Sequence, residues 1–362
     1  MQLELFSKNL IQDLSNLSLN VATVFSGIGS PEQALINLGI KHNILFACDN
    51  DNFVKQSYLA NYQPEKWYSD VKEIDGTKYK DKIDLLVGGS PCQSFSTAGK
   101  RKGFEDTRGT LFYEFARIIK ESQPKVFIYE NVTGLINHDK GKTFEIILNT
   151  FKELGYTYYY QVLNAKDYGT SQSRSRIFII GFKNKNINYI FPEKELLTNT
   201  TINYLETNVD KKYYLSQRSK NYVFKESRLG FCSFNNYVQQ CQLKNQQVNL
   251  NGMLIIEVLK EQNHDKCFDI SELIFTQHIY SRVDYLIDGH TKEVLNKQDL
   301  NIDYKYFQIR KLTPKECLRL MGFNTDTFKI VCSDLQMYYQ SGNSIVVSVL
   351  EKLIKNIPFE NI

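Results

Sequence analysis

Apolar residues are distributed differently in the first half of the chain and in its middle. Between residues 20 and 182, short apolar runs alternate with longer stretches of helical periodicity. The short runs predict strands, and the periodic stretches predict helices. The predicted strands are residues 20–25, 43–48, 83–87, 126–129, 156–163 and 177–182, and the predicted helices are residues 30–39, 52–61, 111–122 and 143–154. This alternation is typical of an α/β fold with a Rossmann-like, mostly parallel sheet and helices on both faces.

Capping signals mark where two of the helices begin. Ser30 is followed by Pro31, so we expect Ser30 to be the N-cap of the first helix. Thr313 and Glu316 have the spacing of a second capping box, and Gly322 is the expected stop of the helix that this box opens.

The pattern breaks after residue 182. Residues 185–305 are rich in Asn, Gln, Lys and Tyr, and they show neither a repeat nor a clear periodicity. A recognisable pattern of apolar and polar residues returns at Arg310, and a final apolar helix is predicted for residues 344–354. Because its apolar face needs a core to bury it, we expect this helix to pack against the first part of the chain. The middle segment, residues 185–305, would then be a smaller, irregular insertion between two parts of one folded scaffold.

Composition indicates a soluble globular protein. Of the 362 residues, 42% are hydrophobic and 23% are charged. No apolar stretch approaches the roughly 18 residues of a membrane span. The N-terminal residues lack a basic region followed by an apolar run, so we expect a cytoplasmic protein without an export signal. The net charge of +4 permits binding to a polyanion without requiring it.

The cysteines do not suggest a disulfide framework or a metal centre. Their number is odd and none forms a CxxC pair. His264 and Cys267 come nearest to a zinc pattern, but no second ligand pair accompanies them, so we expect no metal. The seven cysteines are at positions 48, 92, 232, 241, 267, 317 and 332.

One cysteine has the setting of a nucleophile. Cys92 follows Pro91 at the end of the strand predicted for residues 83–87, and it opens a polar loop. The next predicted strand, residues 126–129, ends at Glu130. Two neighbouring strand ends that carry a thiol and a carboxyl form a candidate active site.

A second site is predicted after the first strand. Gly27 and Gly29 lie between a strand and a helix, where glycines allow a tight turn and the close approach of a ligand. Asp49 ends the next strand and is placed to accept hydrogen bonds from ribose hydroxyls. Pro31 and Glu32 occupy the place of the third glycine of the dinucleotide motif. This argues against NAD or FAD and favours another adenosine-bearing cofactor.

The motifs of this chain resemble those of a known family, the DNA (cytosine-5) methyltransferases of bacterial restriction–modification systems. Seven segments match that family's motifs in the right order along nearly the whole chain. Residues 185–305 match none of the motifs, and the family places target recognition there. The matching segments are FSGIG at 25–29, SPCQSFS at 90–96, GFEDTRGTLFYEF at 103–115, ENV at 130–132, QSRSR at 172–176, RKLTPKECLRLMGF at 310–323 and QSGNSIVVSVL at 340–350.

The resemblance implies covalent catalysis on a cytosine flipped out of duplex DNA. Cys92 would add to C6 of the ring, which makes C5 nucleophilic. Glu130 would hydrogen-bond N3 and the exocyclic amine, with burial raising its pKa. Arg176 would bind the cytosine O2, and Arg174 would support the loop or contact a phosphate. Gln172 would contact these residues rather than the base.

The resemblance also implies S-adenosyl-L-methionine as the methyl donor. Asp49 would bind the ribose and Asp70 the adenine amine. Asn50 departs from the family, which often has an aromatic residue there, so adenine stacking at this position is in doubt. The full set of implied cofactor-binding residues is Phe25, Gly27, Gly29, Asp49, Asn50, Asp70, Val71, Pro91, Leu111, Asn343 and Ser344.

With this resemblance, residues 1–184 are expected to form the catalytic domain and residues 185–310 the target-recognition region. Residues 311–362 would carry the late motifs, with the last helix returning to the catalytic domain. We expect a monomer that acts on double-stranded DNA in the nucleoid, with no membrane partner. A cognate restriction endonuclease encoded nearby is a candidate partner.

Several alternatives remain open. The same chemistry on tRNA belongs to a relative with a Cys-Phe-Thr signature, whereas Cys267-Phe268 is followed here by Asp269. A catalytically inactive DNA-binding protein and a nicotinamide oxidoreductase are more remote. The interleaved basic and aromatic residues at 211–228 predict either a phosphate groove or a solvated face. The sequence identifies neither the DNA target nor the residues that read it.

Overall fold

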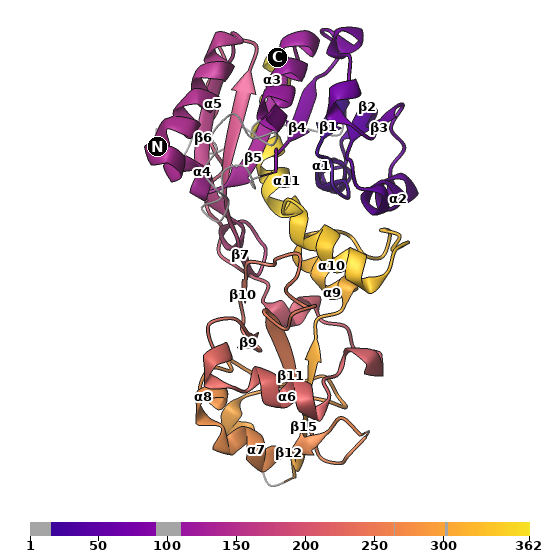
Figure 1. Cartoon of the computed structure of the whole chain (residues 1–362), viewed down its shortest axis with the longest axis vertical. Helices are drawn as coiled ribbons and strands as arrows, with labels where there is room; N and C mark the ends of the chain where they lie inside the picture. Colours follow the sequence, from indigo (N-terminus) through magenta and orange to yellow (C-terminus); the bar gives the residue numbers. More distant parts are fainter. Residues whose placement is uncertain (1–15, 92–109, 264, 301–302) are drawn as a thin grey trace, which may run out of the picture. The chain divides into compact units, whose positions relative to one another are not determined.

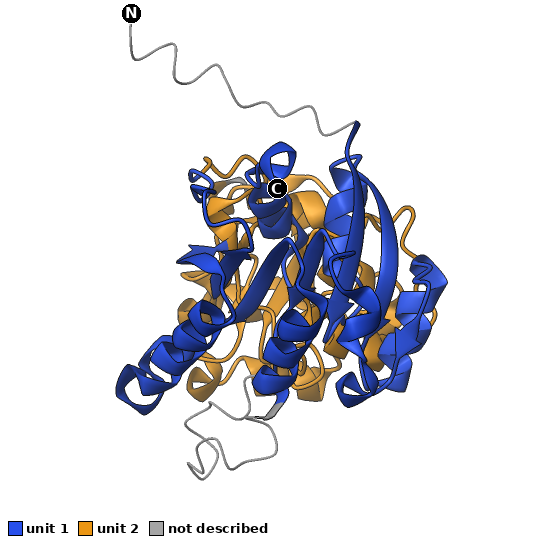
Figure 2. Ribbon diagram, turned by 90° about the horizontal axis from the view of Figure 1, so that it is seen from above, with its two compact units in different colours: residues 1–164, 175–194, 345–362 blue, residues 165–174, 195–344 orange. Residues whose placement is uncertain are grey.

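The computed structural model describes residues 16–91, 110–263, 265–300 and 303–362. The chain divides into two compact units (Figure 2). Unit 1 comprises residues 1–164, 175–194 and 345–362, and unit 2 comprises residues 165–174 and 195–344. The candidate nucleophile Cys92 lies outside the described residues, as do most of its loop and His264.

Unit 1 contains a seven-stranded sheet in the order β3-β2-β1-β4-β5-β8-β6 (Figure 1). The neighbouring strands from β3 to β5 pair in parallel, whereas β8 is antiparallel to both β5 and β6. This confirms the predicted Rossmann-like, mostly parallel sheet. The strands are β1 (Ser18–Val24), β2 (Lys41–Cys48), β3 (Trp67–Tyr68), β4 (Leu85–Gly88), β5 (Val126–Val132), β6 (Thr157–Asn164) and β8 (Ser175–Phe182).

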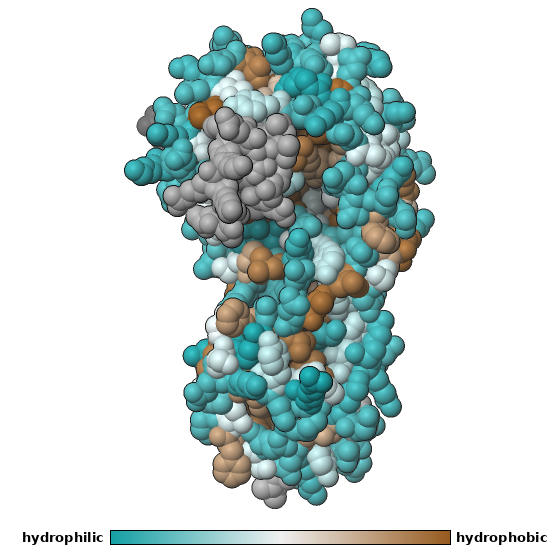
Figure 3. Space-filling view, viewed as in Figure 1, coloured by the Kyte–Doolittle hydropathy of each residue, from teal (hydrophilic) through white to brown (hydrophobic). Residues whose placement is uncertain are grey.

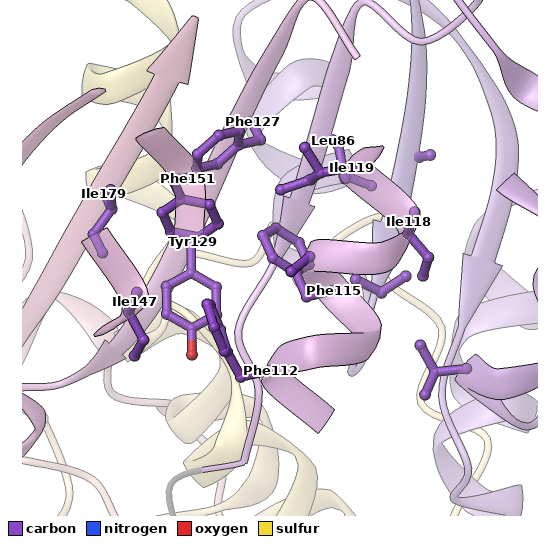
Figure 4. Packing of buried hydrophobic residues seen from close by; sticks show 14 of the residues in the cluster. Leu86, Phe112, Phe115, Ile118, Ile119, Phe127, Tyr129, Ile147, Phe151 and Ile179 are labelled. Atoms are coloured by element: carbon purple, nitrogen blue, oxygen red, sulfur yellow. The ribbon is translucent and has the colours of Figure 1, made fainter. Parts of the chain in front are cut away.

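An aromatic core lies between the sheet and two of the unit 1 helices (Figure 4). Phe112 and Phe115 of α3 and Phe151 of α5 pack against Phe127 and Tyr129 of β5. These side chains are fully buried, which fixes β5 and the residues at its carboxyl end. The helices of unit 1 are α1 (Ser30–Asn37), α2 (Asn52–Asn61), α3 (Thr110–Ser122), α4 (Gly134–Asn137), α5 (Lys142–Glu153) and α11 (Val347–Lys355).

The C-terminal helix α11 belongs to unit 1, where it packs against α1. Asn37 donates a hydrogen bond to Glu351 across this contact at 2.6 Å. Leu350, Leu353 and Ile354 are buried on the apolar face of α11. Although residues 345–362 follow all of unit 2 in the sequence, they thus complete the scaffold of unit 1.

The prediction that Ser30 caps the first helix is wrong. The N-cap is Gly29, which has a left-handed φ of 85° and makes no side-chain cap. A Cβ at Gly29 would also lie 2.2 Å from the Tyr62 ring, so the turn requires glycine. By contrast, the capping box of Thr313 and Glu316 is confirmed, with both reciprocal hydrogen bonds present.

Unit 2 contains a six-stranded sheet in which β11 is central and fully buried. Its strands are β9 (Ser233–Phe234), β11 (Met253–Leu259), β12 (Phe268–Asp269), β13 (Leu286–Asp288), β14 (Val294–Leu295) and β15 (Tyr306–Lys311). A separate pair joins β7 (Gln172–Ser173) to β10 (Gln239–Gln240). The helices are α6 (Gln217–Val223), α7 (Ile270–Phe275), α8 (Gln277–Tyr280), α9 (Pro314–Leu320) and α10 (Asp334–Asn343).

The late motifs differ in detail from the sequence prediction. Helix α10 was not predicted, and the last helix begins at Val347 rather than at residue 344. Asn343 is therefore the final residue of α10, and Ser344 is its C-cap.

A buried ion cluster joins β11, β15 and α9 within unit 2. Arg310 binds Glu316 through two nitrogens, at 2.8 and 2.9 Å, and Glu257 through Nε at 3.1 Å. All three side chains are at most 1% exposed. Burial alone would raise the pKa of Glu257, but the Arg310 and Lys292 cations outweigh it and hold that pKa below its ordinary value.

On the face shown in Figure 3, hydrophilic residues predominate and the exposed apolar residues are dispersed. Among the described residues, no helix has the length and apolar character needed to cross a bilayer.

Candidate active site

The carboxyl ends of β4 and β5 lie side by side and carry the centre of the candidate site. Gly88 is paired with Tyr129 in the parallel register of these strands. A Cβ added to Gly89 would lie 2.7 Å from the Glu130 carbonyl oxygen and 3.0 Å from its Oε2. Only glycine allows this approach, which brings the chain leading to Pro91 directly against Glu130.

A buried hydrogen-bond network fixes the residue that precedes Pro91. Ser90 Oγ lies 2.7 Å from the Tyr129 hydroxyl. Asn131 Nδ2 donates to the Ser90 carbonyl at 3.1 Å and to the Tyr129 hydroxyl at 3.0 Å. All three residues are buried, so the start of the loop is tied to the rigid end of β5. The sequence analysis gave these three side chains no role, although Ser90 and Asn131 lie within its motifs.

Glu130 and Arg176 form an ion pair at the same end of the sheet. Arg176 Nε lies 3.1 Å from Glu130 Oε1, and the two side chains are only 17% and 13% exposed. The antiparallel register of β5 and β8 places Arg176 opposite Val132, two residues beyond Glu130. Arg176 also donates to the Ser175 carbonyl at 2.8 Å. The structure thus brings together two of the predicted catalytic residues.

Arg174 has a different environment, inside unit 2. Its side chain is buried, and one terminal nitrogen donates to the carbonyls of Gln242 at 2.7 Å and Gly342 at 3.2 Å. The other terminal nitrogen donates to the Ser344 carbonyl at 3.0 Å. These contacts favour a role in holding the backbone over the predicted contact with the loop or a phosphate.

Gln172 joins the same buried set of contacts. Its Oε1 accepts from the Gln242 amide at 3.0 Å, and its Nε2 donates to the Leu320 carbonyl at 3.1 Å. The QSRSR segment is therefore divided. Gln172 and Arg174 organise unit 2, and Arg176 belongs to the sheet of unit 1.

Three residues of the loop after β1 have left-handed backbone conformations. Phe25, Gly27 and Gly29 have positive φ values of 55°, 55° and 85°. The value at Phe25 is unusual for a bulky residue and is typical of functional sites. The Gly27 amide donates to Asp49 Oδ2 at 3.0 Å, which ties the loop to the end of β2.

Asp49 has the chemistry of a ribose ligand. Its second oxygen accepts from the Asp51 amide at 3.1 Å, and the Asn50 backbone also bonds the carboxylate, which leaves about one of its four lone-pair sites for a further donor. Burial raises the pKa of Asp49 above its ordinary value. The donor and acceptor set at this strand end therefore fits the ribose of an adenosine cofactor.

The other predicted cofactor residues are placed as follows. Asp70 is exposed and caps a 3-10 turn (Val71–Glu73) by accepting from the Lys72 amide at 2.9 Å, and Val71 is buried. Asn50 and Pro91 are exposed, and Leu111 packs against the aromatic core. Asn343 is exposed and Ser344 is buried, both in unit 2.

A family model of C-5 cytosine-specific DNA methylases matches residues 19–358, nearly the whole chain. The chain belongs to the C-5 cytosine-specific DNA methylase family. Among its relatives, the Type II methyltransferase M.SsoII of Shigella sonnei is 38% identical, over 92% of this chain and 78% of that protein. The Type II methyltransferase M.HhaI of Haemophilus parahaemolyticus is 33% identical, over 96% of each chain.

Solved structures support the fold of this methylase. The Dnmt2 methyltransferase of S. pombe aligns with a TM-score of 0.68, over 93% of this chain and 97% of that one. Its sequence identity is 20%, so the likeness shows a shared fold and nothing beyond it.

In the methylase structure, the basic stretch at 211–228 uses several of its cations internally. Lys220 is 2% exposed and pairs with Glu272. Arg228 packs against two aromatic rings, at 4.5 and 5.0 Å from their centroids. Lys212 binds an aspartate of α10 at 2.7 Å. These contacts do not favour a phosphate groove formed by the whole stretch.

Proposed function

We propose that this chain transfers the methyl group of S-adenosyl-L-methionine to C5 of cytosine within a specific sequence of duplex DNA. The observation that carries this proposal is the Glu130–Arg176 pair, held against the strand end that leads to Pro91 and Cys92. Membership of the methylase family supports the reaction class. The target base would be flipped out of the duplex, at a cost of a few kcal/mol of stacking and pairing.

The reaction requires a nucleophile because C5 of cytosine belongs to a stable ring. The Cys92 thiolate would add to C6 and convert the ring into an enamine, whose C5 carbon then attacks the methyl group. Loss of the C5 proton and departure of the thiolate would restore the ring. Ser90, held by Tyr129 and Asn131, would fix the point from which the Cys92 loop starts.

Glu130 and Arg176 would hold the flipped base and manage its charge. The guanidinium keeps nitrogens beyond the one that faces Glu130, and these suit the cytosine O2 acceptor. Glu130 would accept a hydrogen bond from the exocyclic amine. In its protonated form it would donate its proton to N3, which neutralises the charge that builds there after the thiolate adds.

S-adenosyl-L-methionine supplies the electrophilic methyl group when it is bound. Asp49 would bind its ribose, and the loop of Phe25, Gly27 and Gly29 would lie against its methionine part. Asp70 would bind the adenine amine beside Val71. Pro91, Leu111, Asn343 and Ser344 remain predicted members of the same pocket, and the residue that stacks on the adenine in place of Asn50 is not assigned.

Arg174 and Gln172 would act as positioning residues. Both hold the Gln242 segment, and Arg174 also holds the backbone at Gly342 and Ser344. Through these contacts they would link the target-recognition region to the segment that carries Asn343 and Ser344.

The decisive experiment compares substrates. The protein is incubated with S-adenosyl-L-methionine labelled in the methyl group and with either duplex DNA or tRNA. Label in DNA, absent with Cys92→Ala, supports the proposal, whereas label only in tRNA refutes it. Bisulfite sequencing of DNA from an expressing host then identifies the target. Oligonucleotides that contain 5-fluorocytosine at that target should become covalently trapped on Cys92.

A further inference from the structure

Glu32 is a buried acidic residue to which the proposed mechanism gives no role. It lies in the first turn of α1, and its side chain is completely buried. Burying a carboxyl group is costly unless hydrogen bonds or an opposite charge compensate for it. The surroundings of Glu32 therefore indicate which protonation state the fold accommodates.

Hydrogen bonds link Glu32 to the loop after β1 and to the end of β2. Glu32 Oε1 lies 2.5 Å from the Tyr58 hydroxyl and 3.0 Å from Thr23 Oγ1. Thr23 Oγ1 lies 2.8 Å from Ser26 Oγ, which in turn lies 3.1 Å from the Cys48 carbonyl oxygen. Four oxygen–oxygen contacts thus run in series from Tyr58 to Cys48.

The number of hydrogens decides how these contacts are satisfied. For all four contacts to be hydrogen bonds, four hydrogens are needed, but the hydroxyls of Tyr58, Thr23 and Ser26 supply only three. The Cys48 amide already donates its own hydrogen to Ser26 Oγ, at 2.9 Å. A protonated Glu32 supplies the missing hydrogen, and every contact in the series then has one donor and one acceptor.

The charges around Glu32 also favour its protonated form. No cation of the described residues pairs with it. Beyond Tyr58 and Thr23, the further donor to the carboxyl among these residues is its own backbone amide. Its titratable neighbours are Tyr58 of α2 and Tyr62, the C-cap of that helix, which cannot compensate for a negative charge. Burial raises the pKa of Glu32 above its ordinary value.

We propose that Glu32 is held as a neutral carboxylic acid and acts as a positioning residue that fixes the loop after β1 against the end of β2. Ser26 accepts from Thr23 and from the Cys48 amide, and it donates its own hydrogen to the Cys48 carbonyl. Ser26 directly precedes Gly27, and Cys48 directly precedes Asp49. The series therefore reinforces the hydrogen bond of 2.9 Å from the Ser26 amide to the Cys48 carbonyl, which holds the loop beside the predicted ribose ligand. This role rests on the proposed use of that site for S-adenosyl-L-methionine.

The protonation state is tested by stability against pH. The unfolded chain ionises Glu32 near a pH of about 4.3, whereas the folded protein ionises it only at higher pH. The unfolding temperature of the wild type should therefore fall relative to that of Glu32→Gln as the pH rises from about 4 to 8. Glu65→Gln is the control, because Glu65 is an exposed carboxyl that accepts a hydrogen bond from Asn43. A difference between wild type and Glu32→Gln that does not change with pH would overturn the neutral acid.

The positioning role is tested by the affinity for S-adenosyl-L-methionine, measured by calorimetry on the full chain. In Glu32→Gln the amide nitrogen can donate to both Tyr58 and Thr23, so the affinity should stay within about threefold of wild type. Glu32→Asp is too short to reach both hydroxyls and should weaken binding roughly tenfold. Equal affinity in both variants, or equal loss in both, would overturn the role.

The two measurements separate this proposal from the proposed function. If the wild type does not bind S-adenosyl-L-methionine, the assignment of the cofactor site fails. The pH dependence of stability still decides whether Glu32 is neutral, because it requires no ligand.

Discussion

Arg176 Nε lies 3.1 Å from Glu130 Oε1, although the two residues are 46 positions apart in the sequence and come from strands that run in opposite directions. The pair would place a planar cation and a carboxyl on one flipped base. Arg176→Lys should lower the rate of methyl transfer about 100-fold or more, since lysine cannot hold Glu130 and a base oxygen in the same geometry. Single-turnover transfer to duplex DNA measures the effect.

A matched control lies at the other end of β8. Lys183 pairs with Asp81 at 2.6 Å in an exposed ion pair. Lys183→Met should leave transfer unchanged, because this pair is distant from the strand ends that carry Glu130. Loss of activity in both variants would mean that the sheet, rather than the Arg176 contact, was damaged.

Tyr129→Phe tests the network behind the nucleophile loop. The change removes the hydroxyl that contacts Ser90 and Asn131, and should cost about 1–3 kcal/mol of stability. It should also slow covalent trapping by 5-fluorocytosine DNA while leaving DNA affinity nearly unchanged. Tyr156→Phe, which removes a buried hydroxyl that donates to Pro124, is the control for stability loss alone. Equal trapping rates in the two variants would contradict the positioning of the loop.

The contrast between Arg174 and Arg176 shows what the sequence could predict and what it could not. Apolar runs identified the strands of the unit 1 sheet except the two-residue β3, and the family motifs identified both arginines. The partners of Arg174 lie at 242, 342 and 344, and only tertiary folding brings these segments together. Helix α10 was missed because its sequence, DLQMYYQSGN, has no clear apolar stripe. The Ser30 cap was wrong because the left-handed turn at Gly29 takes its place.

Arg174 offers a test that separates a phosphate contact from a positioning role. Arg174→Lys should weaken methyl transfer and lower the unfolding temperature, because lysine cannot reach all three carbonyls. In both Arg174→Lys and Arg174→Met, the slope of log affinity for DNA against log salt concentration should stay as in the wild type. If Arg174 contacted a phosphate with its charge, removing that charge in Arg174→Met would reduce the slope by about one. Such a reduction would restore the role expected from the sequence.

Acid stability tests the buried cluster of Arg310, Glu257 and Glu316. The depressed pKa of Glu257 means that its contribution to stability is fully present above the unfolded value of about 4.3. That contribution is lost as the pH falls through the lower folded value. Chemical denaturation between pH 6 and 3 should therefore show a steeper loss of stability for wild type than for Glu257→Gln. Arg310→Met should cost about 3–5 kcal/mol at neutral pH, because Glu316 loses its buried cation and Glu257 keeps only Lys292. A wild type and a Glu257→Gln variant with parallel acid profiles would show that Glu257 does not titrate with folding.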